Sequence, residues 1–226
     1  MCRKVSCFGL TIAAWFALTL APTMATASPV LTYPKGTRLA TGSLLQITNI
    51  GVAVFTESEW RLECPTAHVK GKLVTNTGTA VEIELSSFEM SGLGAGEDCR
   101  QDRNKEGSTE IGASVHVTYS GLPWCFRATS QMSADSFDIK AAHCGEIVKN
   151  NVTLVFNYTG LKECKYEISS IQGTFTTEAT GDAILTMKPE LKGEASNSFL
   201  CQSSMPSETA MTLERDSLLA EPVYFS

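Results

Sequence analysis

The chain has 226 residues, a formal net charge of −6, 43% hydrophobic residues and 19% charged residues. This is enough apolar material for a core, so the composition excludes a chain that is disordered along its whole length. The acidic balance argues against a nucleic-acid binder, because such proteins neutralise phosphates with a basic face. The length suits one large domain or two small ones.

Residues 1–27 are expected to be a signal peptide. Arg3 and Lys4 precede a nearly uncharged apolar run, Pro22 ends it, and Ala25-Thr26-Ala27 fits the small-x-small pattern before a cleavage site. An uncleaved anchor is the alternative, although the run is short for a bilayer span of about 20 residues. Cleavage after this tripeptide would remove two positive charges and leave a single domain, residues 28–226, with no later transmembrane segment. We therefore expect a secreted protein, outside the cell or in its envelope.

The remaining chain alternates apolar and polar residues with a period of two, which is typical of strands with one buried and one solvated face. Turn signals such as Asn76-Thr77-Gly78 separate these segments, and no stretch has a convincing helical period. The pattern predicts an all-β fold, an antiparallel β-sandwich of the Ig-like or jelly-roll type, with a long surface loop from Gly92 to Gly112. In chain order, strands are expected at residues 44–50, 60–64, 69–75, 81–85, 115–119, 124–129, 137–140, 152–158, 164–168, 174–177, 184–188, 211–214 and 223–225.

Six cysteines remain after residue 27, and all six are expected to form disulfides. An even set of cysteines in an exported chain is typical of a disulfide framework, and the lack of any Cys-x-x-Cys motif disfavours a zinc cluster. A weak echo, in which Glu-Cys precedes a strand, a glycine, a second strand and another cysteine, occurs twice with cysteine spacings of 35 and 37. This echo indicates either a duplicated module or a coincidence. If the module is duplicated, the simplest pairs are Cys64–Cys99 and Cys164–Cys201, which leaves Cys125–Cys144.

No arrangement of residues in the sequence indicates catalysis, a metal or a cofactor, and we expect none. Glu82 and Glu84 share one strand face, but their apolar neighbours form the inward face, so both are expected to be solvated and not a glycosidase pair. No nucleophile elbow occurs, and paired cysteines leave no reactive thiolate. Four oxygen-bearing residues that would suit calcium are interleaved with basic residues and are expected to be charged surface: Asp98, Asp102, Asn104 and Glu106.

The tryptophans and histidines also have ordinary structural interpretations. Trp60 and Trp124 are candidates for a sugar-stacking platform, but their phase in or at the start of a strand favours the core. His68 and His116 are expected on the polar side of strands. His143 is expected to be held beside the disulfide of its neighbour in sequence.

Several phrases carry a resemblance to known proteins, and they span nearly all of the mature chain. They resemble a group of secreted bacterial β-sandwich proteins with no assigned activity, and more faintly the family of activators of alkane oxidation. The resemblance implies export and a β-fold, and it supplies no catalytic residues. The phrases are Leu31-Thr32-Tyr33-Pro34, Gly36-Thr37, Glu63-Cys64, Gly121-Leu122-Pro123-Trp124-Cys125, Glu163-Cys164-Lys165-Tyr166, Gly173-Thr174-Phe175 and Ala220-Glu221-Pro222-Val223-Tyr224.

The expected function is that of a non-catalytic extracellular or envelope-associated protein that acts by surface binding. Its ligand is unidentified, with a glycan or a hydrophobic surface as candidates and nucleic acid excluded. The alternative is a secreted, glycosidase-like hydrolase on a jelly-roll scaffold, and a third is a structural envelope protein with no specific ligand. A cleft with two carboxylates and an exposed tryptophan would favour the hydrolase, whereas a closed sandwich with both tryptophans buried would favour the binding module.

Overall fold

The structure is a computed structural model. It describes residues 29–33, 36–56, 60–92, 98–103, 111–132, 135–147, 151–159, 162–177, 183–194, 201–215 and 221–225. The expected signal peptide lies outside these residues. Throughout the described chain the regular structure is antiparallel β, with no helix, as the period of two predicts. The described part therefore holds no apolar helix of membrane-spanning length.

The strands form where the alternating residues predict them, and several extend further. Strand β10, for example, buries every second side chain from Val152 to Tyr158. The bounds are β1 Leu31–Thr32, β2 Leu44–Thr56, β3 Trp60–Cys64, β4 Thr66–Asn76, β5 Ala80–Ser91, β6 Cys99–Arg103, β7 Ile111–Ser120, β8 Trp124–Thr129, β9 Ser136–Lys140, β10 Val152–Tyr158, β11 Lys162–Ile168, β12 Ile171–Thr177, β13 Ala183–Met187, β14 Glu190–Gly193, β15 Ser204–Arg215, β16 Glu221–Pro222 and β17 Tyr224–Phe225.

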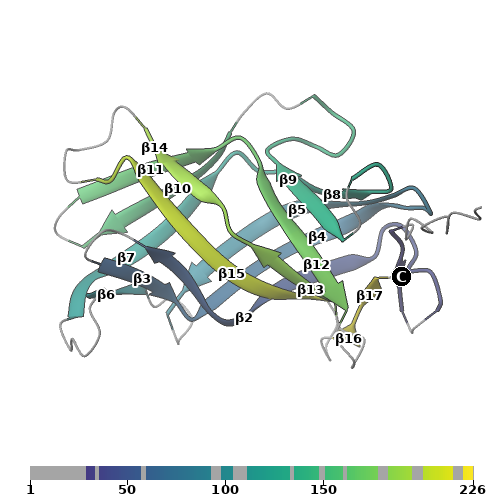
Figure 1. Ribbon diagram of the computed structural model, residues 1–226, viewed down its shortest axis with the longest axis horizontal. Helices are drawn as coiled ribbons and strands as arrows, with labels where there is room; N and C mark the ends of the chain where they lie inside the picture. Colours follow the sequence, from purple (N-terminus) through teal and green to yellow (C-terminus); the bar gives the residue numbers. More distant parts are fainter. Residues whose placement is uncertain are drawn as a thin grey trace, which may run out of the picture.

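Most of these strands belong to one sheet that closes on itself. In the described chain, strands β2 to β16 are joined by hydrogen bonds in the order β13-β12-β9-β8-β5-β4-β2-β3-β6-β7-β10-β11-β14-β15-β16, and β15 also pairs with β2 and β13. Strand β15, yellow in Figure 1, runs across the molecule and joins β14 to β13 and β2, which closes the sheet. The all-β, antiparallel prediction is confirmed. The Ig-like or jelly-roll sandwich stays a prediction, because strands β2 to β16 form one continuous hydrogen-bonded sheet and not two separate sheets.

Four of the strand pairings occur twice in the same order, whereas the β2–β4 pair of the first repeat has no counterpart in the second. In a first repeat, residues 44–120, the pairs are β2–β3, β3–β6, β4–β5 and β6–β7. In a second repeat, residues 152–215, the matching pairs are β10–β11, β11–β14, β12–β13 and β14–β15. The repeats meet through β7–β10 and β15–β2, and a β8–β9 hairpin is inserted between them. These pairings support the duplicated module over coincidence.

Three disulfides connect the cysteines of the described chain in the predicted pairs. Cys64–Cys99, Cys125–Cys144 and Cys164–Cys201 have Cα–Cα distances of 4.6, 5.0 and 5.6 Å. Cys64–Cys99 joins the neighbouring strands β3 and β6, whereas Cys201 lies after β14, so the second cysteines of the two repeats occupy different places. Three disulfides indicate an oxidising environment.

The predicted loop from Gly92 to Gly112 is wrong in part. Strand β6 and the start of β7 lie within it. The alternation was hidden by the charges: Cys99 and Gln101 are buried, while the intervening Arg100 and Asp102 face outward and pair with each other. A strand with outward charges on every second residue therefore looks like a charged loop in the sequence.

One core runs through both repeats and the inserted hairpin. Phe55 of β2 packs edge-on against Phe156 of β10, with ring centroids 5.2 Å apart, and Phe156 packs against Tyr166 of β11. In the hairpin, Phe126 stacks on Phe137 at 4.7 Å. All these side chains are buried, so the two repeats and the hairpin stabilise each other through shared apolar contacts.

The two ends of the described chain meet in a separate small sheet. Strand β1 pairs with β17, with Leu31 opposite Phe225. The buried side chain of Asn76 accepts a hydrogen bond from the Leu31 amide at 2.9 Å and donates to the carbonyl oxygens of Leu31 and Leu39 at 2.8 Å. Because Asn76 satisfies backbone groups that water cannot reach, it fixes residues 31–39 against the end of β4.

Candidate functional site

The closed sheet is interrupted between β5 and β7. Strand β8 pairs with β5 only as far as Leu85, and β6 pairs with β7 only as far as Val115. Beyond these points, no described strand pairs with the edge of residues 86–91 that faces away from β4, or with the edge of residues 116–120 that faces away from β10. We call this opening the seam. In the second repeat the matching strands, β13 and β15, pair directly over five residues of β13, Ala183–Met187.

The seam contains a hollow of about 440 Å³ with an apolar floor and a polar mouth. Phe88 and Val117 are buried, whereas Glu89 and His116 are exposed, because side chains alternate between the two faces of each strand. The hollow is lined by Phe88, Glu89, Met90, Ser91, His116, Val117, Thr118 and Tyr119. Its size lies in the range of small-molecule pockets, about 300–1,000 Å³.

Three aromatic rings form the floor of the seam. Phe88 lies 5.5 Å from Tyr119 and 5.4 Å from Trp124, and Tyr119 lies 6.2 Å from Trp124. Trp124 is buried, which confirms the prediction that it belongs to the core, and its Nε1 has no hydrogen-bond partner. The side chain of Trp60 lies outside the described side chains. Trp124 therefore offers no exposed stacking platform for a sugar.

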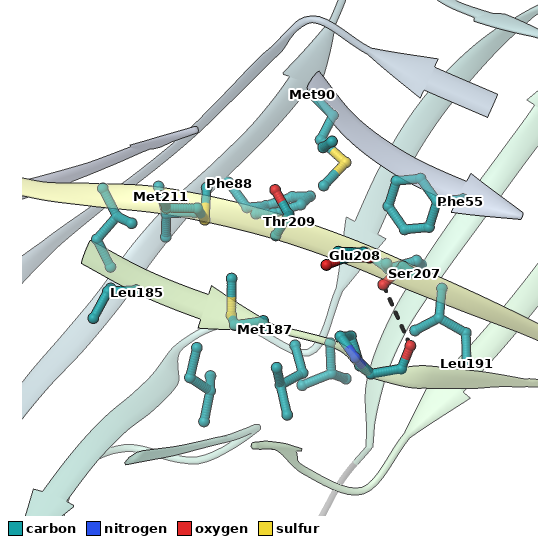
Figure 2. Close-up of a pocket in the computed structure, with 18 of the residues that line it drawn as sticks. Phe55, Phe88, Met90, Leu185, Met187, Leu191, Ser207, Glu208, Thr209 and Met211 are labelled. Atoms are coloured by element: carbon teal, nitrogen blue, oxygen red, sulfur yellow. Dashed lines mark hydrogen bonds between the residues drawn. The ribbon is translucent and has the colours of Figure 1, made fainter. Parts of the chain in front are cut away.

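A second, interior cavity of about 60 Å³ lies behind this floor. Figure 2 shows Met90, Met187 and Met211 around it, together with Phe55 and Phe88. Phe88 and Met90 line both the cavity and the seam, so the two hollows are neighbours on either side of these side chains. Methionine side chains adjust readily to different apolar shapes, so this lining can rearrange around an apolar group.

The far wall of the cavity is a β-bulge between β2 and β15. Residues 51–53 of β2 oppose Thr209 alone, and Gly51 has a φ of 72°, a conformation that a residue with a Cβ rarely adopts. The Thr209 hydroxyl is buried without a hydrogen-bond partner. Next to it, Ser207 donates its amide and its hydroxyl to the Pro189 carbonyl at 2.9 and 3.4 Å (Figure 2). A cavity of this size is well below the roughly 150 Å³ of an apolar cavity that admits benzene, so it suits only a slender apolar end group.

The mouth of the seam is acidic. Asp98 accepts hydrogen bonds from Ser114 Oγ at 2.8 Å and bonds His116 Nδ1 at 3.1 Å. Glu89 lies directly opposite His68 in the β4–β5 register, and none of the described residues that line the hollow is a lysine or arginine. Asp98, His116 and Ser114 are the residue types of a serine-hydrolase triad, but Ser114 donates to Asp98 and not to His116. The arrangement therefore lacks the serine–histidine hydrogen bond that would activate a nucleophile.

The carboxylates Glu82 and Glu84 lie on the outer face of β5, away from the seam. Glu82 lies 3.2 Å from Arg127 Nε and accepts from Thr75 Oγ1 at 2.8 Å; only 14% of its side chain is exposed. Glu84 lies 2.9 Å from His143 Nδ1. Glu82 is therefore more enclosed than the solvated carboxylate we expected, because cross-strand partners cover it. A shallow hollow of about 200 Å³ beside these pairs also holds the ion pair of Asp138 with Lys140, at 2.6 Å.

The remaining predicted site residues are dispersed. Asp102 accepts a hydrogen bond from Arg100 Nε at 2.7 Å, and this bond, with the attraction of the two charges, raises the pKa of Arg100. Asn104 and Glu106 lie outside the described residues. Over the described ranges, no three histidine, cysteine, aspartate or glutamate side chains gather where they would hold a metal ion. His68 Nδ1 lies 3.4 Å from Thr48 Oγ1.

No protein-family model, curated protein or solved structure matches this chain. The function must therefore be argued from the geometry of the site. Sequence reasoning missed the seam, because a bulge after Leu85 shifts the phase of the alternation before it resumes at Phe88 and Met90, where no strand was expected.

Proposed function

We propose that the protein is an exported, non-catalytic binding protein that holds a small amphiphile in the seam, with the apolar end of the ligand directed inward. The observation that carries the proposal is that Phe88 and Met90 line both the polar-mouthed seam and the apolar cavity behind it. A ligand in this place would contact polar side chains at one end and mostly apolar side chains at the other. This is the contact pattern that an amphiphile requires.

The shape of the site favours a single alkyl chain as the apolar part. The seam is several times larger than the cavity, so a ligand that passes from the seam between Phe88 and Met90 would follow a path that narrows inward. A slender chain can follow that path, whereas a sugar would leave its hydroxyl groups without partners against Val117, Tyr119 and Phe88. A hydrophobic ligand therefore has more support than a glycan.

Export and the absence of catalysis are parts of the same proposal. The apolar run and Ala25-Thr26-Ala27 support a signal peptide, and the disulfides support an oxidising destination such as the cell envelope or the extracellular space. Against a glycosidase, the carboxylates of Glu82 and Glu84 are each held by a partner, Arg127 and His143, and Glu82 lines only a shallow hollow.

Titration of the secreted, disulfide-bonded protein with 1-octanol in a calorimeter tests the proposal. We expect saturable binding to one site, because the seam and cavity provide a single apolar path. Met90→Arg should weaken binding at least about tenfold, since it brings a charge to the floor of the site, where an alkyl chain would otherwise be buried.

The control is Val74→Arg, which places the same charge on an exposed apolar residue of β4 that lines neither hollow. Its affinity should equal that of the wild type. An absence of saturable octanol binding, or equal weakening by both variants, would contradict the proposal.

A further inference from the structure

We propose that the seam selects amphiphiles with a positively charged head group, an alkylammonium in chemical class. The inference rests on the proposed function, because it concerns the head group of a ligand whose chain lies in the seam. The observations that carry it are the charges at the mouth of the hollow and the depth at which the chain ends.

Two carboxylates stand at the mouth, and the described residues that line it include no lysine or arginine. Glu89 is exposed and belongs to the lining, and Asp98 holds His116, which also belongs to it. Lys70 lies opposite Ser87 in the register and does not line the hollow. His68 lies opposite Glu89, and Arg100, which is paired with Asp102, lies opposite Ser114 beside Asp98. Among the described residues that line the hollow, Glu89 therefore supplies a negative charge that no lysine or arginine balances.

The narrow inner end fixes the direction of the ligand. The cavity behind Phe88 and Met90 is lined mostly by apolar side chains, and its one charged lining residue among those described, Glu208, is already paired with Lys188 at 2.6 Å. A charged head group in the cavity would therefore lose water without gaining a free partner. The head group must then remain at the mouth, between Glu89 and His116. An ammonium would be attracted there, and a carboxylate would meet Glu89 as a like charge.

The aromatic floor adds to this preference. Tyr119 is half-buried and lines the hollow, and its ring packs edge-on against Phe88 and Trp124. The face of an aromatic ring attracts cations, so an ammonium that enters below Glu89 meets a second favourable surface.

The test compares three probes that share one chain: octylammonium, 1-octanol and octanoate, titrated at pH 8 and low ionic strength. We expect octylammonium to bind about tenfold more tightly than octanoate, with octanol between them, and the difference to fall to about threefold in 0.5 M salt. Ethylammonium, which has the head group without the chain, should show no saturable binding.

Two variants separate local charge from the net negative charge of the protein. Glu89→Gln should reduce the preference for octylammonium over octanoate to about threefold or less, and Glu89→Lys should reverse it. Glu190→Gln removes an exposed carboxylate of β14 that lines neither hollow, and it should preserve the preference.

The outcomes distinguish the two proposals. If all three octyl probes bind equally, or octanoate binds best, the head-group inference is overturned while the seam remains a site for amphiphiles. If Glu190→Gln reduces the preference as much as Glu89→Gln, the selectivity belongs to the net charge and the inference is overturned as well. If no octyl probe binds, the proposed function itself fails.

Discussion

Among the differences between the two repeats, the one beside the β8–β9 hairpin creates the seam. In the second repeat β13 lies against β15 and pairs with it, whereas in the first repeat β5 and β7 diverge. The inserted β8–β9 hairpin explains the difference, because β8 pairs with the first half of β5, which is the edge that β7 would otherwise occupy. Similar strand orders therefore give a closed wall on one side and a lined hollow on the other.

Removing the disulfide beside the seam should have the largest effect on the first repeat. The double variant Cys64→Ser/Cys99→Ser should lower the free energy of unfolding by about 4 kcal/mol, since the bridge closes a long loop in the unfolded chain. Denaturant unfolding measures the loss. The matched Cys125→Ser/Cys144→Ser variant removes a bridge that closes a shorter loop, so it should lose about 3 kcal/mol. A larger loss for this variant than for Cys64→Ser/Cys99→Ser would show that the hairpin depends more on its bridge than the first repeat does.

Truncation of side chains should distinguish the closed wall from the open one. Leu185→Ala, in the middle of the β13–β15 pair, should reduce stability by about 3 kcal/mol, because the leucine is fully buried. Met90→Ala, in the seam, should cost about 1 kcal/mol, since that side chain already contacts solvent and can be replaced without a closed cavity. The same denaturant titrations provide the comparison. Equal losses would mean that the seam is as tightly packed as the wall.

Hydrogen exchange should show the smallest and most local difference. Amide protons of β13 point to β12 or β15 and should be protected throughout the strand. Roughly every second amide of residues 86–91 faces the seam and should exchange much faster, because one edge of an antiparallel strand carries alternate N–H groups. Mass spectrometry or NMR resolves the two patterns. Uniform protection of residues 86–91 would place a partner strand in the seam.

The class of fold and the disulfide pairs could be predicted from the sequence because both depend on local signals. Period-two alternation marks β10 and β11, and an even set of cysteines with an echoed spacing marks the bridges. The seam could not be predicted, because it depends on which of two distant strands, β7 or β8, takes the edge of β5. The resemblance to secreted β-proteins and the predicted cleavage site stay predictions.

The charged surface was predicted less well than the core. Glu82 and Glu84 were expected in solvent, yet Glu82 is covered by Arg127 and Thr75 and Glu84 by His143. Arg127 and His143 lie 45 or more positions from the glutamates that they contact. The pairing of β5 with β4 and β8 brings Thr75 and Arg127 to Glu82. Cross-strand charge pairs of this kind follow from register, which alternation alone does not determine.

The pairing of β1 with β17 has a consequence for the order of biosynthesis. Leu31 and Thr32 lie near the start of the chain and their partners, Phe225 and Tyr224, near its end. Strand β1 therefore cannot pair with β17 until residues 224 and 225 have been made, although Asn76 and Leu39 can bond Leu31 earlier. Contacts between segments this far apart in the sequence form only after most of the described chain has been made, so this small sheet cannot assist folding during synthesis.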